Sequence, residues 1–226
     1  MHRIIERAQE EKRSLLETEA KELLKVYEIP VPAFQLIKKE EDINKLSKGL
    51  GYPIVMKIVS PDIIHKSDIG GVKIGIHNEI EAVKSYQEII SNVQNDKKEA
   101  RIYGVIAYQM IPQATEIIIG MIKDPQFGPV IMFGLGGIFV EILKDISFRI
   151  LPLEERDAED MISEIKGYKI LKGVRGESPK DIIAIKEVLM KISQLVMENP
   201  EIKEIDLNPV FVFEKGLQVV DARMIL

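Results

Sequence analysis

Three groups of side chains in the 226-residue sequence have the types and spacing needed to handle a phosphorylated ligand. The first is Lys57, which lies within the apolar run Ile54–Val59. In an extended strand it would point to the same face as Val55 and Val59. An ammonium group in such surroundings needs an anion, and a nucleotide phosphate would serve. This residue alone leaves open a lysine at a sheet edge whose head group reaches solvent.

The second group is the polar loop around His65, one of three histidines in the chain. The sequence HKSDIGG places its imidazole beside a lysine, a hydroxyl, a carboxylate and two glycines. Glycines let a ligand approach the backbone closely, and an imidazole can accept a phosphoryl group covalently. An ordinary surface loop is the alternative at this point. His2 is terminal and His77 continues a predicted strand, so we interpret both as structural.

The third group lies near the end of the chain, in the segment DLNP at 206–209 and at Asp221. Asp206 and Asn208 are two residues apart on a predicted strand and therefore share a face. A hairpin turned at Lys215 brings Asp221 to within about a residue of the position opposite Asn208. Such oxygen ligands suit Mg²⁺, which takes few protein ligands and completes its shell with water and substrate phosphates. A polar hairpin with an Asn-Pro turn remains the alternative.

Two further segments carry weaker signals. The run Gly134–Gly137 follows a strand and could hold an anion with its backbone N–H groups, although it lacks the Lys-Ser/Thr of a P-loop. The strand Tyr108–Pro112 could offer backbone groups to an adenine, with Glu116 nearby for a ribose or a lysine. Without further context a simple core strand is favoured.

Helices and strands expected to position these groups follow from the spacing of apolar residues and from the turn residues between them. The first 28 residues are predicted to be helical, with Pro30 and Pro32 ending the pattern. The other predicted helices cover residues 40–50, 79–93, 154–165 and 179–197. The predicted strands cover residues 33–37, 54–60, 72–76, 102–111, 115–123, 130–133, 139–150, 205–213 and 217–222. Short turns favour antiparallel pairing, so we predict an α+β protein with an N-terminal helical segment (1–28) and two lobes (29–101 and 102–226).

Composition excludes several classes of function. A net charge of −5, with lysines interleaved among acids, argues against a nucleic-acid partner. The absence of cysteine excludes disulfides and thiolate chemistry. No apolar run approaches the ~18 residues of a membrane span, and the amino terminus is too charged for a signal peptide. The sequence therefore predicts a cytoplasmic protein without a membrane partner, and its richness in Ile, Lys and Glu hints at a thermophile.

In this order, a strand lysine, a glycine-bearing loop, an inter-lobe strand and a late Asn–Asp pair resemble an ATP-grasp module. The chain is similar to the β subunits of ADP-forming acetyl-CoA (acyl-CoA) synthetases, relatives of succinyl-CoA synthetase. The match runs from about residue 15 to the end, and its most specific segments are HKSDIGGVKIGI, FGLGGIFVEILKDISFR and EIDLNPV. The resemblance implies an ATP-grasp fold with the nucleotide bound between two α/β lobes. It also implies the reversible reaction of acyl-CoA, ADP and phosphate to acid, CoA and ATP.

The resemblance also implies residue roles. His65 matches the family's second histidine, which takes a phosphoryl group from an α-subunit histidine and carries it to ADP. Asp206 matches the acid that orients this histidine. Lys57 matches a phosphate-contacting lysine, while Asn208 and Asp221 match the Mg²⁺ ligands. The residues that fall where the adenosine is held are Gln109, Met110 and Glu116.

The chain shows no Rossmann-like series with a glycine fingerprint of its own. The resemblance therefore implies an α subunit that carries the CoA site and the first phosphohistidine, in an α2β2 heterotetramer that is active only when assembled. One alternative is an ATP-grasp ligase that works through an acyl-phosphate without phosphohistidine. Another is a non-catalytic nucleotide-sensing module.

Overall fold

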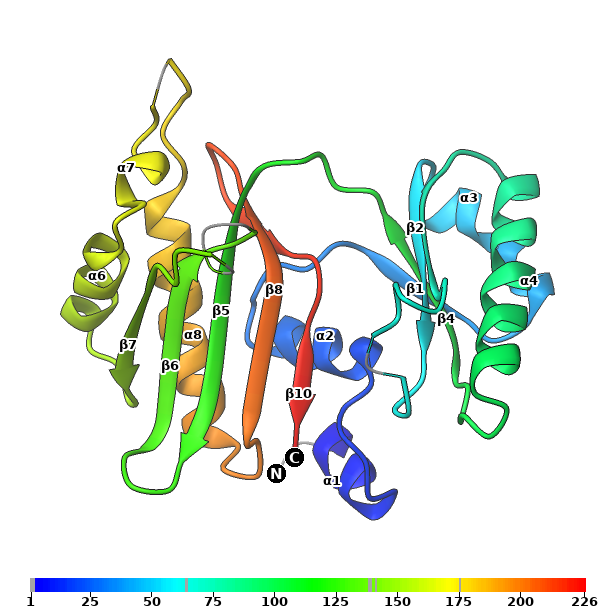
Figure 1. Cartoon of the computed structure of the whole chain (residues 1–226), viewed down its shortest axis with the longest axis horizontal. Helices are drawn as coiled ribbons and strands as arrows, with labels where there is room; N and C mark the ends of the chain where they lie inside the picture. The colour runs from blue at the N-terminus through cyan, green and yellow to red at the C-terminus, as the bar shows by residue number, and fades with distance from the viewer. Residues whose placement is uncertain (1–2, 64, 138–139, 141, 175) are drawn as a thin grey trace. The chain divides into compact units, whose positions relative to one another are not determined.

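The computed structural model describes residues 3–226 apart from 64, 138, 139, 141 and 175. The chain divides into two compact units, and each combines helices with one antiparallel sheet (Figure 1). The smaller unit is Pro32–Pro112, and the larger unit joins Met1–Val31 to Gln113–Leu226. No helix within the described residues is long and apolar enough to cross a membrane.

A four-stranded sheet forms the smaller unit, in the order β1-β4-β2-β3 with every neighbouring pair antiparallel. The strands are β1 (Phe34–Ile37), β2 (Ile54–Val59), β3 (Val72–Ile76) and β4 (Gly104–Gln109). The helices are the 3₁₀ helix η1 (Glu40–Lys45), α3 (Leu46–Gly49) and α4 (Glu79–Asp96).

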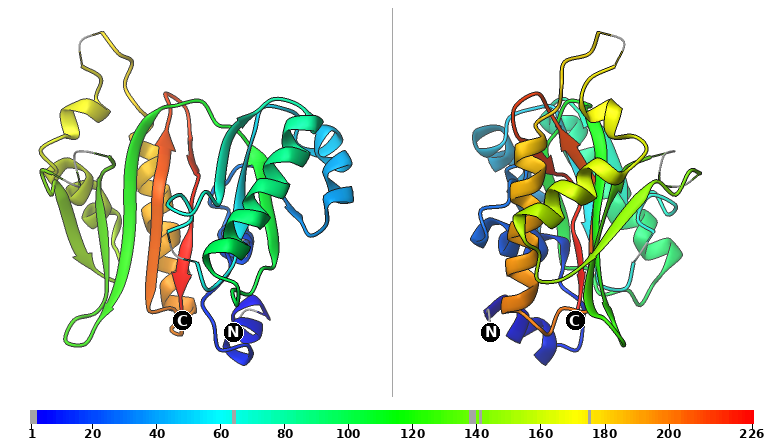
Figure 2. Two further views of the ribbon diagram at one scale, coloured as in Figure 1. Left: turned by 45° about the vertical axis from the view of Figure 1, so that its right-hand side comes forward. Right: turned by 90° about the vertical axis from the view of Figure 1, so that its left-hand side faces the viewer.

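Helix α4 packs against one face of this sheet (Figure 2). Its N-cap is Asn78, whose side chain accepts a hydrogen bond from the Glu81 N–H at 2.9 Å and so satisfies a free donor of the first turn. Its buried residues, such as Ile89 and Val93, join Met56 of β2 in one core. Strand β2 is buried on both faces, because it lies in the middle of the sheet.

A six-stranded antiparallel sheet forms the larger unit, in the order β10-β8-β5-β6-β7, with β9 also paired to β8. The strands are β5 (Thr115–Asp124), β6 (Gly128–Leu135), β7 (Ile146–Ile150), β8 (Glu204–Val212), β9 (Leu217–Val219) and β10 (Arg223–Ile225). The described helices are α1 (Arg3–Glu10), α2 (Glu17–Val26), α6 (Glu155–Glu164), α7 (Tyr168–Leu171) and α8 (Ile182–Glu198).

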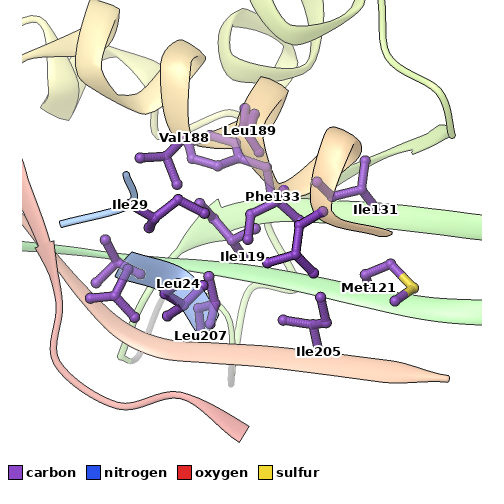
Figure 3. Close-up of a cluster of buried hydrophobic side chains, with 14 of the residues drawn as sticks. Leu24, Ile29, Ile119, Met121, Ile131, Phe133, Val188, Leu189, Ile205 and Leu207 are labelled. Atoms are coloured by element: carbon purple, nitrogen blue, oxygen red, sulfur yellow. The ribbon is translucent and has the colours of Figure 1, made fainter. Parts of the chain in front are cut away.

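The core of the larger unit lies between one face of its sheet and the helices α2 and α8 (Figure 3). Alternate residues of β5, β6 and β8 point into it, as expected for a sheet with one face on the core. Val188 and Leu189 of α8 meet this face from the helix side. Its buried members include Leu24, Ile29, Ile119, Met121, Ile131, Phe133, Ile205 and Leu207.

Several predicted elements differ in extent from those observed. Residues 3–28 contain two helices and not one, because the chain turns at Lys12, which has a φ of 48°. Residues 40–50 are a 3₁₀ helix followed by one short α-helical turn. The strand predicted over 139–150 begins only at Ile146, after Lys144 with a φ of 47°; its residues 139 and 141 lie outside the described part of the chain.

The boundary between the units also differs from the lobes predicted at 1–28, 29–101 and 102–226. Strand β4 follows residue 101 yet belongs to the smaller unit, because it pairs with both β1 and β2. Helices α1 and α2 belong to the larger unit, where Ile5 and Leu23 are fully buried in its core. The chain thus enters the smaller unit after α2 and leaves it after β4.

Candidate nucleotide-binding and phosphoryl-transfer site

Lys57 lies on β2, between β3 and β4, and only 8% of its surface is exposed. Its ammonium group lies 5.2 Å from the centroid of the Tyr108 ring, within the range of a cation–π contact. This position excludes a lysine at a sheet edge. A cation in a buried place is well suited to an anionic ligand, because little water competes for it.

The loop that carries His65 leaves the imidazole exposed. Ile63, two residues earlier, is buried in the core of the smaller unit. After the histidine, a tight turn is closed by the Gly71 N–H, which donates to the Lys66 carbonyl at 2.8 Å. Gly70 has a φ of 67°, a conformation that favours glycine. The fold therefore presents the histidine to solvent between the buried Ile63 and the turn closed at Gly71.

Asp206 and Asn208 lie on β8, and Asp221 lies between β9 and β10. The strand registers on either side place Asn208 opposite Asp221 and Asp206 opposite Arg223, as the predicted hairpin requires. Asn208 is exposed, and the two aspartates are half-buried. An amide oxygen and a carboxylate are therefore neighbours on adjacent segments.

Electrostatics set Asp206 apart from the other acids. Burial raises its pKa, and the nearby Asp221 carboxylate raises it further, while the Arg223 guanidinium acts in the opposite direction. Two carboxylates close enough to repel one another favour a bound cation. The described residues contain no group of three or more acids or histidines that could hold a metal alone. A cation here would have Asn208 and Asp221 as ligands and take the rest from water and phosphates, which suits Mg²⁺.

Glu116 lies at the start of β5 and contacts the glycine run through its backbone. The Gly136 N–H donates to the Glu116 carbonyl at 2.8 Å. A Cβ atom on Gly136 would lie 2.9 Å from that of Glu116, so only glycine permits this approach. Gly134 lies within β6, and a Cβ there would lie 2.7 Å from the Asp145 carbonyl oxygen. The described part of the glycine run therefore serves close packing between strands.

The predicted site residues are divided between the two units. Lys57, His65, Gln109 and Met110 belong to the smaller unit. Gln109 pairs with Ile54 at the end of β4, and the Met110 N–H donates to the Pro53 carbonyl at 3.0 Å. Both residues are exposed, and they lie at the end of the strand. The residues that belong to the larger unit are Glu116, Asp206, Asn208 and Asp221.

Two ordered carboxylates were not predicted from the sequence. Asp62 receives hydrogen bonds from the side chain and the backbone of Arg101. Asp145, 5% exposed, accepts from the N–H groups of Lys166 and Gly167, each at 2.7 Å. Their partners are 39 and 21 or 22 residues away, so no local spacing reveals them. The only signal in the sequence was the charged side chain of Asp62 next to an isoleucine.

Comparison with known proteins first identifies the class of domain to which the chain belongs. A family model described as an ATP-grasp domain matches residues 6–226. The chain is 57% identical to acetate–CoA ligase [ADP-forming] I subunit beta from Pyrococcus furiosus, over 99% of this chain and 96% of that subunit. It is 46% identical to acetate–CoA ligase [ADP-forming] I from Archaeoglobus fulgidus, over 99% of this chain but only 32% of that longer protein.

Solved structures agree with this class. A structure of the dinucleotide-forming acetyl-coenzyme A synthetase 1 of Ca. Korarchaeum cryptofilum, with coenzyme A, Ca-AMPCP and HgCl+, has a TM-score of 0.94 and 50% identity. The match covers 98% of this chain and 97% of that one. PH1788 from Pyrococcus horikoshii matches with a TM-score of 0.95 and 48% identity, over 99% and 96% of the two chains. The chain belongs to the ATP-grasp family of ADP-forming acetate–CoA ligase β subunits.

Proposed function

We propose that this chain is the nucleotide-binding β subunit of an ADP-forming acetyl-CoA or acyl-CoA synthetase. In the direction of ATP synthesis, acyl-CoA, ADP and phosphate give the acid, CoA and ATP. The phosphoryl group passes from a phosphohistidine of an α subunit to His65, and from His65 to ADP. The observation that carries this proposal is the exposed His65 between β2 and β3, in a chain similar over nearly its whole length to a β subunit of that name.

Each transfer exchanges one bond to phosphorus for another. The unprotonated imidazole nitrogen of His65 attacks the phosphoryl group as its P–N bond to the donor histidine breaks, and a terminal ADP oxygen later displaces His65 in turn. Such steps need nearly in-line geometry with the reacting atoms within ~3–3.5 Å. A carrier on a loop therefore serves when donor and acceptor lie farther apart than that. In Ca. Korarchaeum cryptofilum, one structure has its phosphohistidine segment in a site I orientation and another has it pointing towards the nucleotide binding site.

The other side chains support these steps. Lys57 offsets the negative charge of the phosphates. Asp206 orients the imidazole and stabilises its charged form, as carboxylates do for catalytic histidines. Asn208 and Asp221 would hold Mg²⁺, which supplies further charge neutralisation at the nucleotide. The adenosine is assigned to the neighbourhood of Gln109, Met110 and Glu116.

The proposal requires an α subunit with the CoA site, and we infer an α2β2 heterotetramer that works in the cytoplasm. Support for a partner comes from the relatives: the Pyrococcus protein is named a subunit, whereas this chain spans only 32% of the Archaeoglobus protein. We infer that the α subunit supplies here what the remainder of that longer protein supplies there. ATP/ADP is the assigned nucleotide.

The decisive experiment replaces His65 by alanine in a complex reconstituted with the α subunit. We expect ATP formation from acetyl-CoA to fall on the order of 10²-fold or more, with the dissociation constant for Mg·ADP changed by less than about two-fold. The wild-type chain should carry acid-labile ³²P label on His65. The matched control is His77→Ala, because His77 is also exposed in the same unit but follows β3.

Other outcomes point to other functions. An acyl-phosphate ligase without phosphohistidine would keep most of its turnover in the His65→Ala variant. A nucleotide-sensing module would bind Mg·ADP but show neither label nor turnover with any α subunit. Direct delivery by the partner's phosphohistidine would give turnover with label on the α subunit alone. Any of these three results would contradict the carrier role of His65.

A further inference from the structure

The loop that carries His65 is attached at its beginning through Asp62. The Asp62 carboxylate accepts hydrogen bonds from Arg101 Nε at 3.1 Å, from Arg101 Nη2 at 2.8 Å and from the Arg101 N–H at 2.8 Å. The Asp62 carbonyl also accepts from Lys97 Nζ at 2.7 Å. This one residue therefore joins the start of the loop to the segment between α4 and β4.

Burial strengthens the same attachment. The Asp62 N–H donates to the Ser60 hydroxyl at 3.2 Å, and Ser60 is itself buried. The next residue, Ile63, is 7% exposed and packs into the core of the smaller unit. Arg101 lowers the pKa of Asp62 to about 2, so the carboxylate is ionised at any physiological pH. The attachment combines a paired charge, backbone bonds and a buried side chain.

The end of the loop is attached separately, to α4 and β2. Asn92 Nδ2 on α4 donates to the Gly70 carbonyl at 3.3 Å, and a Cβ on Gly70 would lie 2.5 Å from the same nitrogen. The Ile58 N–H donates to the Gly71 carbonyl at 2.8 Å. His65 stands between the two attachments, with its own side chain exposed. All of these contacts lie within the smaller unit.

We propose that Asp62 and Arg101 are positioning residues for phosphoryl transfer, and that with Asn92 and Gly70 they fix the two ends of the segment that moves the His65 imidazole. This inference rests on the proposed function. Fixed ends limit the segment to a small set of paths, since its reach is bounded by its length. They thereby lower the entropy that must be lost before the imidazole reaches an in-line position.

The test compares Asp62→Ala, Asp62→Asn and Arg101→Ala in the reconstituted complex. The measured quantities are the rate of ³²P transfer from His65 to ADP, amide hydrogen exchange in the loop, and the dissociation constant for Mg·ADP. Asp62→Asn keeps an acceptor for the backbone N–H of Arg101 but loses the ion pair. The matched control is Arg149→Ala, which removes a similar two-bond pair with Glu164 (2.9 and 2.6 Å) in the larger unit.

We expect Asp62→Ala and Arg101→Ala to slow the transfer about 10-fold or more and to speed exchange of the loop amides, with Mg·ADP affinity changed less than about two-fold. Asp62→Asn should fall between them and the wild type, and Arg149→Ala should resemble the wild type. Arg101 is half exposed on its side chain, so its variant keeps the test available if Asp62→Ala fails to fold.

A transfer rate in Arg101→Ala within about two-fold of the wild-type rate would overturn the inference. A loss in Mg·ADP affinity as large as the loss in transfer rate would also overturn it. Unchanged exchange of the loop amides would do the same. A wild-type chain that never carries label would refute the proposed function instead. The exchange measurement would then still decide whether these residues hold the loop.

Discussion

Replacing Lys57 by methionine removes a buried ammonium group while leaving a side chain of similar length. If Lys57 contacts a nucleotide phosphate, the lost hydrogen bond is charge-assisted and contributes ~1.5–3 kcal/mol. This corresponds to about a 10- to 150-fold weaker affinity for Mg·ADP. Because Lys57 is only 8% exposed, water screens the contact weakly, and we expect a value in the upper part of this range.

Fold stability should respond much less to the same substitution. The variant loses the cation–π contact with Tyr108, which contributes ~0.5–2 kcal/mol. The substitution also removes the penalty for keeping an ammonium group away from water, and this change stabilises the fold. We therefore expect the free energy of unfolding to change by less than ~1 kcal/mol, within the range of an ordinary substitution.

Isothermal titration of Mg·ADP into the isolated chain and into the reconstituted complex measures the effect. Lys73→Met is the matched control, because Lys73 lies opposite Met56 on the neighbouring strand, is one-third exposed and pairs with Glu88. This control should bind Mg·ADP as the wild type does. A Lys57→Met chain that is folded and binds Mg·ADP within about two-fold of the wild type would refute the phosphate contact.

Three further predictions concern the larger unit. Asp206→Asn should raise the free energy of unfolding at pH 7, because burial raises the pKa of Asp206 and so penalises its ionised form in the folded state. In urea denaturation this gain should vanish below about pH 4. The turnover of the same variant should fall about 10²-fold. Gly136→Ala should lower the unfolding free energy by ~1–3 kcal/mol in the same assay, because its Cβ would lie 2.9 Å from that of Glu116. Asp145→Ala should lower it by ~1.5–3 kcal/mol for each lost bond, one of them from Gly167, with Asp145→Asn near half of that loss. If any one of these variants behaves as the wild type does, that result contradicts the contact on which its prediction rests.

The class of fold could be predicted from the sequence because the apolar pattern and the turns are local. The run Ile54–Val59 is apolar at every position except Lys57, and a strand in the middle of a sheet has this pattern. The register of the last hairpin also followed from local features, since the turn at Lys215 and the period of two fix which residues face one another. Asn208 and Asp221 are opposite each other for this reason.

The division into units could not be predicted in this way, because it depends on pairing between distant segments. Strand β4 belongs to the smaller unit through its pairing with β1, where Phe34 lies opposite Tyr108, and through its pairing with β2. The two N-terminal helices carry an ordinary amphipathic pattern that does not say which sheet they cover. The prediction therefore followed chain order, whereas hydrogen bonding joins segments far apart in the sequence.

The same limit explains why the anchoring of the histidine loop was missed. His65 and the two glycines after it form a motif that a single segment reveals. The partners of Asp62 and Gly70 are instead Arg101 and Asn92, which lie 39 and 22 residues further along the chain.

A carrier loop has two requirements that act against each other. The imidazole of His65 must be able to leave one site. The loop must also have few enough conformations that the imidazole arrives at the next site within hydrogen-bonding distance of its partner there. Strong attachment of the loop along its whole length would satisfy the second requirement and defeat the first. Attachment at Asp62 and Gly70, with the histidine exposed between them, meets both, because the entropy lost on ordering the ends is lost once on folding and not at each transfer. The ion pair at Asp62 suits this purpose better than an apolar contact would, since the bidentate geometry of Arg101 fixes direction as well as distance.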